Sequence, residues 1–178
     1  MITTIHGIRV TSPAATWVDI AAELSLRDLV AVGDHFIFGG RPLTSRAALQ
    51  DEILARTGQR GVKRARAAWD LLDEGSESRR ESHLRVLLVS NGLGQFQSNV
   101  WVATSDGHRY RGDLVDPARK IIIEYQSAFH HDPQRQQADM VRRSRLQADG
   151  WIVIEVSRRD LDHATDLLDR IRRTLARR

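Results

Sequence analysis

The sequence predicts an α/β protein, in which an all-α N-terminal segment precedes a mixed unit of helices and strands. Apolar residues recur at helical spacing through residues 1–74. Further along, an Asp-Gly turn at residues 106–107 separates two β-like runs, and three consecutive isoleucines at residues 121–123 mark a buried strand. A polar, glycine-containing stretch joins the two parts, so we expect one domain at residues 1–74 and a second at residues 75–178.

Four helices are expected in the N-terminal segment. The first begins at Ser12-Pro13, because serine caps the first backbone N–H groups of a helix and proline suits its first turn. The others are expected at residues 25–38, 45–56 and 61–72, with glycine-containing breaks between them.

The second part is expected to have the order helix, three strands, helix, strand, helix. The ranges, in that order, are residues 79–91, 95–104, 109–115, 120–126, 133–149, 151–156 and 161–175. Tight turns at residues 105–107 and 116–119 predict that the first three strands form an antiparallel meander.

Composition restricts the class of protein. The 178 residues carry a net charge of +4, and arginine greatly outnumbers lysine, which suits phosphate binding but also simple solubility. The absence of cysteine excludes a disulfide scaffold, a thiolate zinc site and a cysteine nucleophile. No stretch approaches the about 18 apolar residues of a membrane span, and the first ten residues lack a signal-peptide core. We therefore expect a soluble, cytoplasmic protein without a membrane partner.

Two carboxylates are expected on neighbouring strands of the meander, Asp113 on one and Glu124 on the next. A turn centred on residues 117–118 sets them diagonal, and a turn centred one residue later sets them face to face. Both registers keep them on one face of the sheet, as metal-assisted phosphodiester hydrolysis requires of its carboxylates. Alternatively, Glu124 forms an ion pair with Arg109 or Arg111, since an unpaired charge in a central strand is costly.

The stretch from residue 111 to residue 156 resembles the PD-(D/E)XK (restriction-endonuclease-like) superfamily, specifically the small bacterial group related to very-short-patch-repair endonucleases. The residues RGDLVDPARKIIIEYQSAFHH carry its two carboxylates, and DMVRRSRLQADGWIVIEV carries its helix and closing strand. The resemblance implies a restriction-endonuclease-like core and a DNA endonuclease that depends on Mg²⁺ or Mn²⁺. Asp113, Glu124 and the main-chain carbonyl of Tyr125 would bind the metal.

The resemblance also assigns roles to residues around this pair. Gln126 stands where the superfamily usually has lysine and would orient the attacking water. His130 would assist the leaving group, while the adjacent His131 either contacts nucleic acid or lies in solvent. Glu81 matches a position on the preceding helix that binds metal or water, but with Ser78 it also forms a helix-capping box.

Arginines of the helix expected at residues 133–149 are candidate nucleic-acid contacts, namely Arg135, Arg142 and Arg143. Pairing of Arg142 and Arg143 with Asp139 along one helix face is the simpler alternative.

The N-terminal residues RVTSPAATWVDIAAELSLRDLVAVGDHFI resemble the helical segment that follows a winged helix in AbiEi-type antitoxins. The winged helix is absent or reduced to the first ten residues, which suggests a truncated or alternatively started chain. Two other functions stay open: a non-catalytic DNA-binding or regulatory protein of antitoxin type, and an RNase that uses the same carboxylates. The expected partner is DNA, or RNA in the last case, with a homodimer as a further option.

Overall fold

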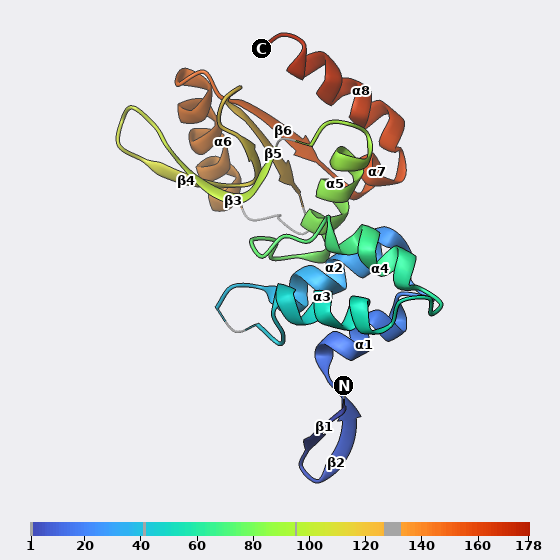
Figure 1. Ribbon diagram of the computed structural model, residues 1–178. Coiled ribbons are helices and arrows are strands. Elements are labelled where there is room, and N and C mark those ends of the chain that lie inside the picture. The colour runs from blue at the N-terminus through green and yellow to red at the C-terminus, as the bar shows by residue number, and fades with distance from the viewer. Residues whose placement is uncertain (1, 41, 95, 127–132) are drawn as a thin grey trace. The chain divides into compact units, whose positions relative to one another are not determined.

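The computed structural model describes residues 2–40, 42–94, 96–126 and 133–178. The described chain is α/β, with eight helices and two sheets. It forms two compact units, Met1–Val86 and Leu87–Arg178 (Figure 1). The division falls inside helix α5 (Arg79–Ser90) rather than at the polar stretch before it.

The N-terminal unit begins with a β-hairpin. Strands β1 (Ile2–Ile5) and β2 (Ile8–Thr11) pair in antiparallel fashion. The turn residues His6 and Gly7 have positive φ angles of 49° and 80°, the combination that a type I′ turn needs. The expectation of an all-α segment is thus corrected for its first residues. The signal that could have found the hairpin is the His-Gly pair with β-branched residues on both sides.

Helices follow the hairpin, and their starts agree with the sequence-based expectation. They are α1 (Pro13–Ile20), α2 (Leu26–Ile37), α3 (Arg46–Ala55) and α4 (Val62–Trp69). The hydroxyl oxygens of Ser12, Ser25 and Ser45 each accept a backbone N–H in the first turn of the helix that follows. Local capping therefore fixes where the first three helices begin.

The buried faces of these helices enclose one core. Trp17 and Leu29 are fully buried, and the Trp17 indole N–H donates to the Leu29 carbonyl at 2.9 Å. Gly33 permits close packing here, because a Cβ at this position would lie 2.4 Å from Leu72 Cδ2. Val86 of α5 belongs to the same core, so the first half of α5 packs with the N-terminal unit.

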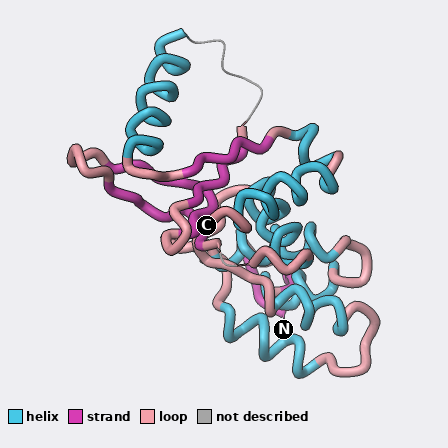
Figure 2. The backbone as a smooth tube through the Cα atoms, turned by 90° about the horizontal axis from the view of Figure 1, so that it is seen from above, coloured by secondary structure: helices cyan, strands magenta, loops and turns pink. Residues whose placement is uncertain are grey.

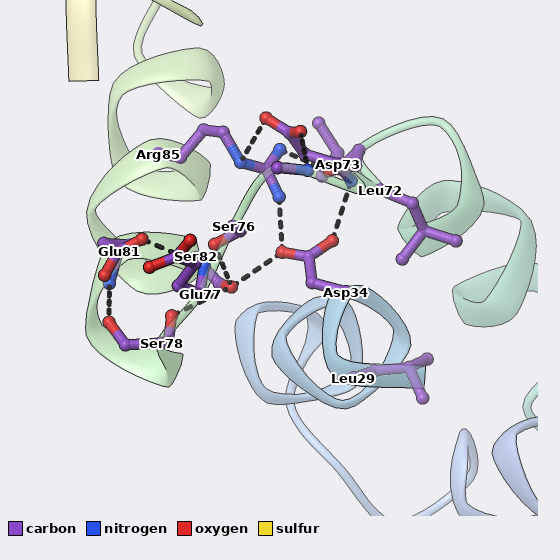
Figure 3. Close-up of polar contacts among 12 residues, drawn as sticks. Leu29, Asp34, Leu72, Asp73, Ser76, Glu77, Ser78, Glu81, Ser82 and Arg85 are labelled. Atoms are coloured by element: carbon purple, nitrogen blue, oxygen red, sulfur yellow. Dashed lines mark hydrogen bonds and ion pairs between the residues drawn. The ribbon is translucent and has the colours of Figure 1, made fainter. Parts of the chain in front are cut away.

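Polar contacts hold this half of α5 in the same unit (Figure 3). Asp34 of α2 is 1% exposed and accepts hydrogen bonds from the Ser82 hydroxyl and the Arg85 guanidinium, both at 2.6 Å. It also accepts the Asp73 backbone N–H at 2.8 Å. Arg85 donates in addition to the Leu71 carbonyl. Because these contacts satisfy a buried carboxylate, the N-terminal unit extends beyond residue 74.

Asp28, in the first turn of α2, is a second carboxylate with several partners. The Ser25 hydroxyl donates to one of its oxygens at 2.6 Å, and Arg79 and His83 lie 2.7 and 2.9 Å from the other. The hydrogen bond from Ser25, aided by Arg79 and His83 and opposed by burial, lowers the pKa of Asp28 to about 2.

This carboxylate should make the N-terminal unit sensitive to acid. A group with a depressed pKa stabilises the folded state above its ordinary value of 3.8 and loses that contribution as pH falls towards 2. We expect the free energy of unfolding to fall more steeply below about pH 4 in the wild type than in Asp28→Asn. Hydrogen exchange of amides in this unit, measured across the acid range, gives the two slopes; equal slopes would contradict the assignment.

The C-terminal unit contains a four-stranded sheet of order β3-β4-β5-β6. The strands are β3 (Gln97–Ala103), β4 (Arg109–Asp116), β5 (Ile121–Tyr125) and β6 (Ile152–Val156). The first three form an antiparallel meander, and β6 pairs with β5 in parallel after helix α6 (Pro133–Ala148). The element order expected from the sequence is confirmed as far as β6.

One correction concerns the end of the chain, where a single helix was expected. Ser157 and Asp160 form a capping box that begins a short helix, α7 (Arg158–Asp162), before α8 (Ala164–Leu175). The Ser-x-x-Asp spacing of this box is a signal that the sequence already carries.

Helices cover both faces of the sheet. Ile122 packs with Leu146 of α6, whereas Ile121 and Ile123 alternate to the other face and are fully buried. Figure 1 shows α6 and α8 on opposite sides of the strands, and in Figure 2 α6 is the helix that follows the grey segment. Strand β5 is therefore buried on both faces, and a charge at its end needs a partner.

Gly112 of β4 lies where the sheet has no room for a side chain. A Cβ there would lie 2.7 Å from both Ile122 Cγ2 and Val115 Cγ2. We expect Gly112→Ala to lower the free energy of unfolding by about 1–3 kcal/mol, because these branched side chains would have to shift. Urea unfolding measures the change. The control is Gly39→Ala, where a Cβ meets no atom within 4 Å and the change should stay below about 0.5 kcal/mol.

Candidate functional site

Asp113 and Glu124 lie on the adjacent strands β4 and β5. Leu114 pairs with Ile123, so continuing the antiparallel register by one residue sets Asp113 across from Glu124. This is the register of a turn centred on residues 118–119, one of the two that the sequence left open.

Glu124 is a nearly buried carboxylate with a cationic partner. Its side chain is 10% exposed, and Arg142 of α6 donates to both of its oxygens, with Nη1 at 2.8 Å from Oε2. Arg142 Nη2 also donates to the main-chain carbonyl of Arg111 at 2.9 Å. The ion-pair alternative is thus present, but with Arg142 in place of Arg109 or Arg111. The reason is that α6 covers the face of β5 that carries Ile122 and, by alternation, Glu124.

Asp113 and Glu124 both act on this guanidinium. Burial alone would lower the pKa of Arg142, but the hydrogen bonds and charge of Glu124 outweigh burial, and Asp139 and Asp113 add to the effect. The net result is a pKa above the ordinary value of arginine. Asp113 Oδ2 also accepts the backbone N–H of Tyr125 at 2.8 Å. The end of β5 is therefore a compact group of two carboxylates and one arginine.

A neighbouring polar group contains a residue that sequence reasoning missed. Gln126 Nε2 donates to Glu155 Oε1 at 3.1 Å, and Arg143 of α6 forms an ion pair with the same carboxylate. The parallel register sets Glu155 of β6 beside Glu124 of β5. The signal that could have found Glu155 is an acidic residue in the otherwise apolar run at residues 152–156.

The other predicted site residues are Glu81, His130, His131 and Arg135. Glu81 lies in the N-terminal unit, where its carboxylate accepts the Glu77 N–H at 3.0 Å and its own N–H donates to Ser78 Oγ at 3.2 Å (Figure 3). These are the contacts of a helix cap. His130 and His131 lie outside the described residues, as does the side chain of Arg135.

The donor chemistry at the end of β5 can be compared with the needs of a divalent cation. Mg²⁺ is commonly held by one or two carboxylates together with water, so Asp113 and Glu124 fit as ligand types. Arg142 bonds both oxygens of Glu124, and a cation would compete with it there. Among the described residues, no group of three or more His, Cys, Asp or Glu side chains is arranged to hold a metal ion. The fit therefore rests on two carboxylates and requires that Arg142 give way.

In the described part of the chain, no helix combines the length and the apolar character that a membrane crossing demands.

Comparison with known proteins gives relatives without an assigned function. The chain is 27% identical over 153 residues to the uncharacterized proteins Rv2248 and MT2308, from two strains of Mycobacterium tuberculosis. The match covers 85% of this chain and 56% of each relative, so the chain spans little more than half of their length. No protein-family model matches the chain, and no solved structure matches it.

Proposed function

We propose that the C-terminal unit is a metal-dependent endonuclease that hydrolyses phosphodiester bonds in DNA, built on a restriction-endonuclease-like core. The observation that carries the proposal is Glu124, a 10% exposed acid at the end of an interior, isoleucine-rich strand, with Asp113 across from it. Charge in such a position is costly, so its presence favours a chemical role over a purely structural one.

The order of elements supports the same proposal. A helix, three antiparallel strands, a helix and a further strand follow one another from α5 to β6, and this is the order that the resemblance implies for this core. Helix α6 brings Arg142 to Glu124. Guanidinium groups bind phosphate oxygens well, so an arginine at this place suits a phosphodiester substrate.

Each residue of the group would have a defined task. Asp113, Glu124 and the main-chain carbonyl of Tyr125 would hold Mg²⁺ or Mn²⁺, which when bound supplies an activated water and offsets charge on the phosphate. Gln126, whose amide nitrogen is engaged by Glu155, would accept a hydrogen bond from the attacking water through its amide oxygen. His130 would donate a proton to the leaving oxygen.

The remaining predicted residues would act around this centre. Arg142 and Arg143 would exchange their carboxylate partners for phosphate oxygens as substrate arrives. Arg135 and His131 would contact the nucleic-acid backbone.

A second candidate function has an observation in its favour. Arg142 occupies both oxygens of Glu124, and glutamine replaces the usual lysine at position 126. A non-catalytic DNA-binding or regulatory protein that keeps this core would show the same two features.

A cleavage assay separates these functions. The purified chain would be incubated with supercoiled plasmid, single-stranded DNA and RNA, each with Mg²⁺, Mn²⁺ or EDTA. We expect DNA cleavage that EDTA abolishes and that Mn²⁺ supports better than Mg²⁺, since manganese tolerates mixed nitrogen and oxygen ligands. Cleavage of RNA alone would instead indicate an RNase, and DNA binding without cleavage by either metal would indicate the regulatory protein.

A further inference from the structure

A hollow of about 480 Å³ lies between β4 and α6 in the C-terminal unit. It is within the size range of small-ligand sites, about 300–1,000 Å³. Four of its lining residues carry the inference: His108, Tyr110, Arg142 and Arg145.

Two aromatic rings form a platform in this hollow. The rings of His108 and Tyr110 are nearly parallel, at 8°, with centroids 6.2 Å apart. Tyr110 lies on β4 and His108 precedes the first residue of that strand, and Tyr110 packs at the margin of the core. A flat, partly exposed ring anchored by a core is a surface on which a nucleobase can stack.

Cations surround the same ring. The Arg142 guanidinium lies 5.6 Å from the centre of the Tyr110 ring, and Arg145 Nη1 donates to the Tyr110 hydroxyl at 3.2 Å. Asp106 faces the rim, where it pairs with Arg145 at 3.1 Å and with His108 at 3.2 Å. Arg142 is paired with Glu124 and Arg145 with Asp106, so the two guanidinium groups would bind the phosphate of a ligand with a flat base by exchanging these carboxylates for phosphate oxygens.

Arg142 links this hollow to the carboxylates. The same guanidinium lines the hollow and bonds both oxygens of Glu124. A phosphate attached to a base stacked on Tyr110 would therefore meet Arg142 beside Glu124.

We propose that this hollow binds one unstacked nucleotide of a single-stranded nucleic acid, with the base on Tyr110 and the adjoining phosphate at Arg142 and Arg145. The inference rests on the proposed nuclease function and deepens it by naming the form of the substrate. A base inside a duplex offers its edges to protein and hides its faces against its neighbours, so the Tyr110 ring favours a base that is out of the stack.

The test measures binding without cleavage. Fluorescence anisotropy in EDTA would give dissociation constants for a labelled single-stranded oligonucleotide and for the duplex of the same sequence. The wild type should bind the single strand more tightly. Tyr110→Ala should weaken this binding about tenfold or more, because stacking of one base contributes on that scale, whereas Tyr110→Phe should keep it.

Further variants keep the result interpretable. His108→Ala removes a side chain that is 46% exposed, so it should weaken single-strand binding without unfolding the protein. Trp101→Ala is the matched control. Trp101 neighbours Val102, the partner of Tyr110, and alternation turns it to the other face of the sheet, where its ring contacts Arg109. This control should leave the affinity within about twofold.

Two outcomes would overturn the proposal: equal affinity for duplex and single strand, or unchanged single-strand binding in both Tyr110→Ala and His108→Ala. Both can occur whether or not the protein cleaves DNA. Conversely, if single-strand binding depends on Tyr110 but the protein cleaves no nucleic acid, the proposed nucleotide site would be supported and the proposed nuclease function would be refuted.

Discussion

Replacing Arg85 by alanine is expected to lower the free energy of unfolding of the N-terminal unit by about 3–5 kcal/mol. Arg85 is the cationic partner of Asp34, which is 1% exposed, and the two side chains meet at 2.6 Å (Figure 3). Removing the guanidinium would leave a carboxylate in an apolar interior with hydrogen bonds from Ser82 and the Asp73 N–H but without an opposite charge. Urea unfolding measures the loss of stability, and hydrogen exchange of the amides in Met1–Val86 assigns it to the N-terminal unit.

A matched control lies on the same helix. Arg79 is 72% exposed and pairs with Asp28 at 2.7 Å, so Arg79→Ala should cost less than about 1 kcal/mol. Equal losses of unfolding free energy in Arg79→Ala and Arg85→Ala would show that the burial of an ion pair does not determine how much it stabilises this unit.

The loss of stability in Arg85→Ala should depend on pH in a characteristic way. Burial raises the pKa of Asp34 above 3.8, although Arg85, Ser82 and the Asp73 N–H oppose the rise. Because the folded state then binds the proton more tightly than the unfolded state, stability falls as pH rises from 3.8 to the raised pKa. Loss of Arg85 extends this interval upwards, so the destabilisation at about pH 7 should exceed that at about pH 4. A loss independent of pH would contradict this account.

Glu124→Gln and Asp113→Asn are each expected to reduce metal-dependent DNA cleavage by about 10³-fold or more, since loss of a metal ligand removes several kcal/mol of charge stabilisation. Both substitutions nearly conserve shape, and in Glu124→Gln the amide oxygen of the new side chain could still accept a hydrogen bond from Arg142. The fold should therefore persist, which circular dichroism and thermal unfolding would check.

Asp169→Asn is the control for this experiment. Asp169 is a 52% exposed carboxylate on α8 that pairs with Arg172 at 3.0 Å. Its cleavage rate should equal that of the wild type. Unfolding of both site variants would instead mean that Asp113 and Glu124 serve the fold, and full activity in both would refute the nuclease proposal.

The turn before β5 shows how far the sequence could specify the carboxylate pair. The residues at 116–119 predicted a tight turn but allowed two registers. The structure has the register centred on residues 118–119, in which Asp116 pairs with Ile121 and its buried carboxylate accepts the Arg119 backbone N–H at 3.1 Å and the Arg119 guanidinium at 2.8 Å. The contact between Asp116 and Arg119 forms where the end of β4 is buried. That burial is set by the rest of the sheet.

The sequence by itself determined the order of the elements from α5 to β6 and the strands that carry Asp113 and Glu124. Those features follow from local signals, since serine caps, the Asp-Gly turn and the alternation of apolar residues act within a few positions of one another. Tertiary structure alone decided that Arg142 is the partner of Glu124, 18 positions away, and that Asp34 is paired with Arg85, 51 positions away. Such choices depend on which helix covers a buried charge, because the cost of desolvating that charge is offset by whichever cation the fold brings within reach.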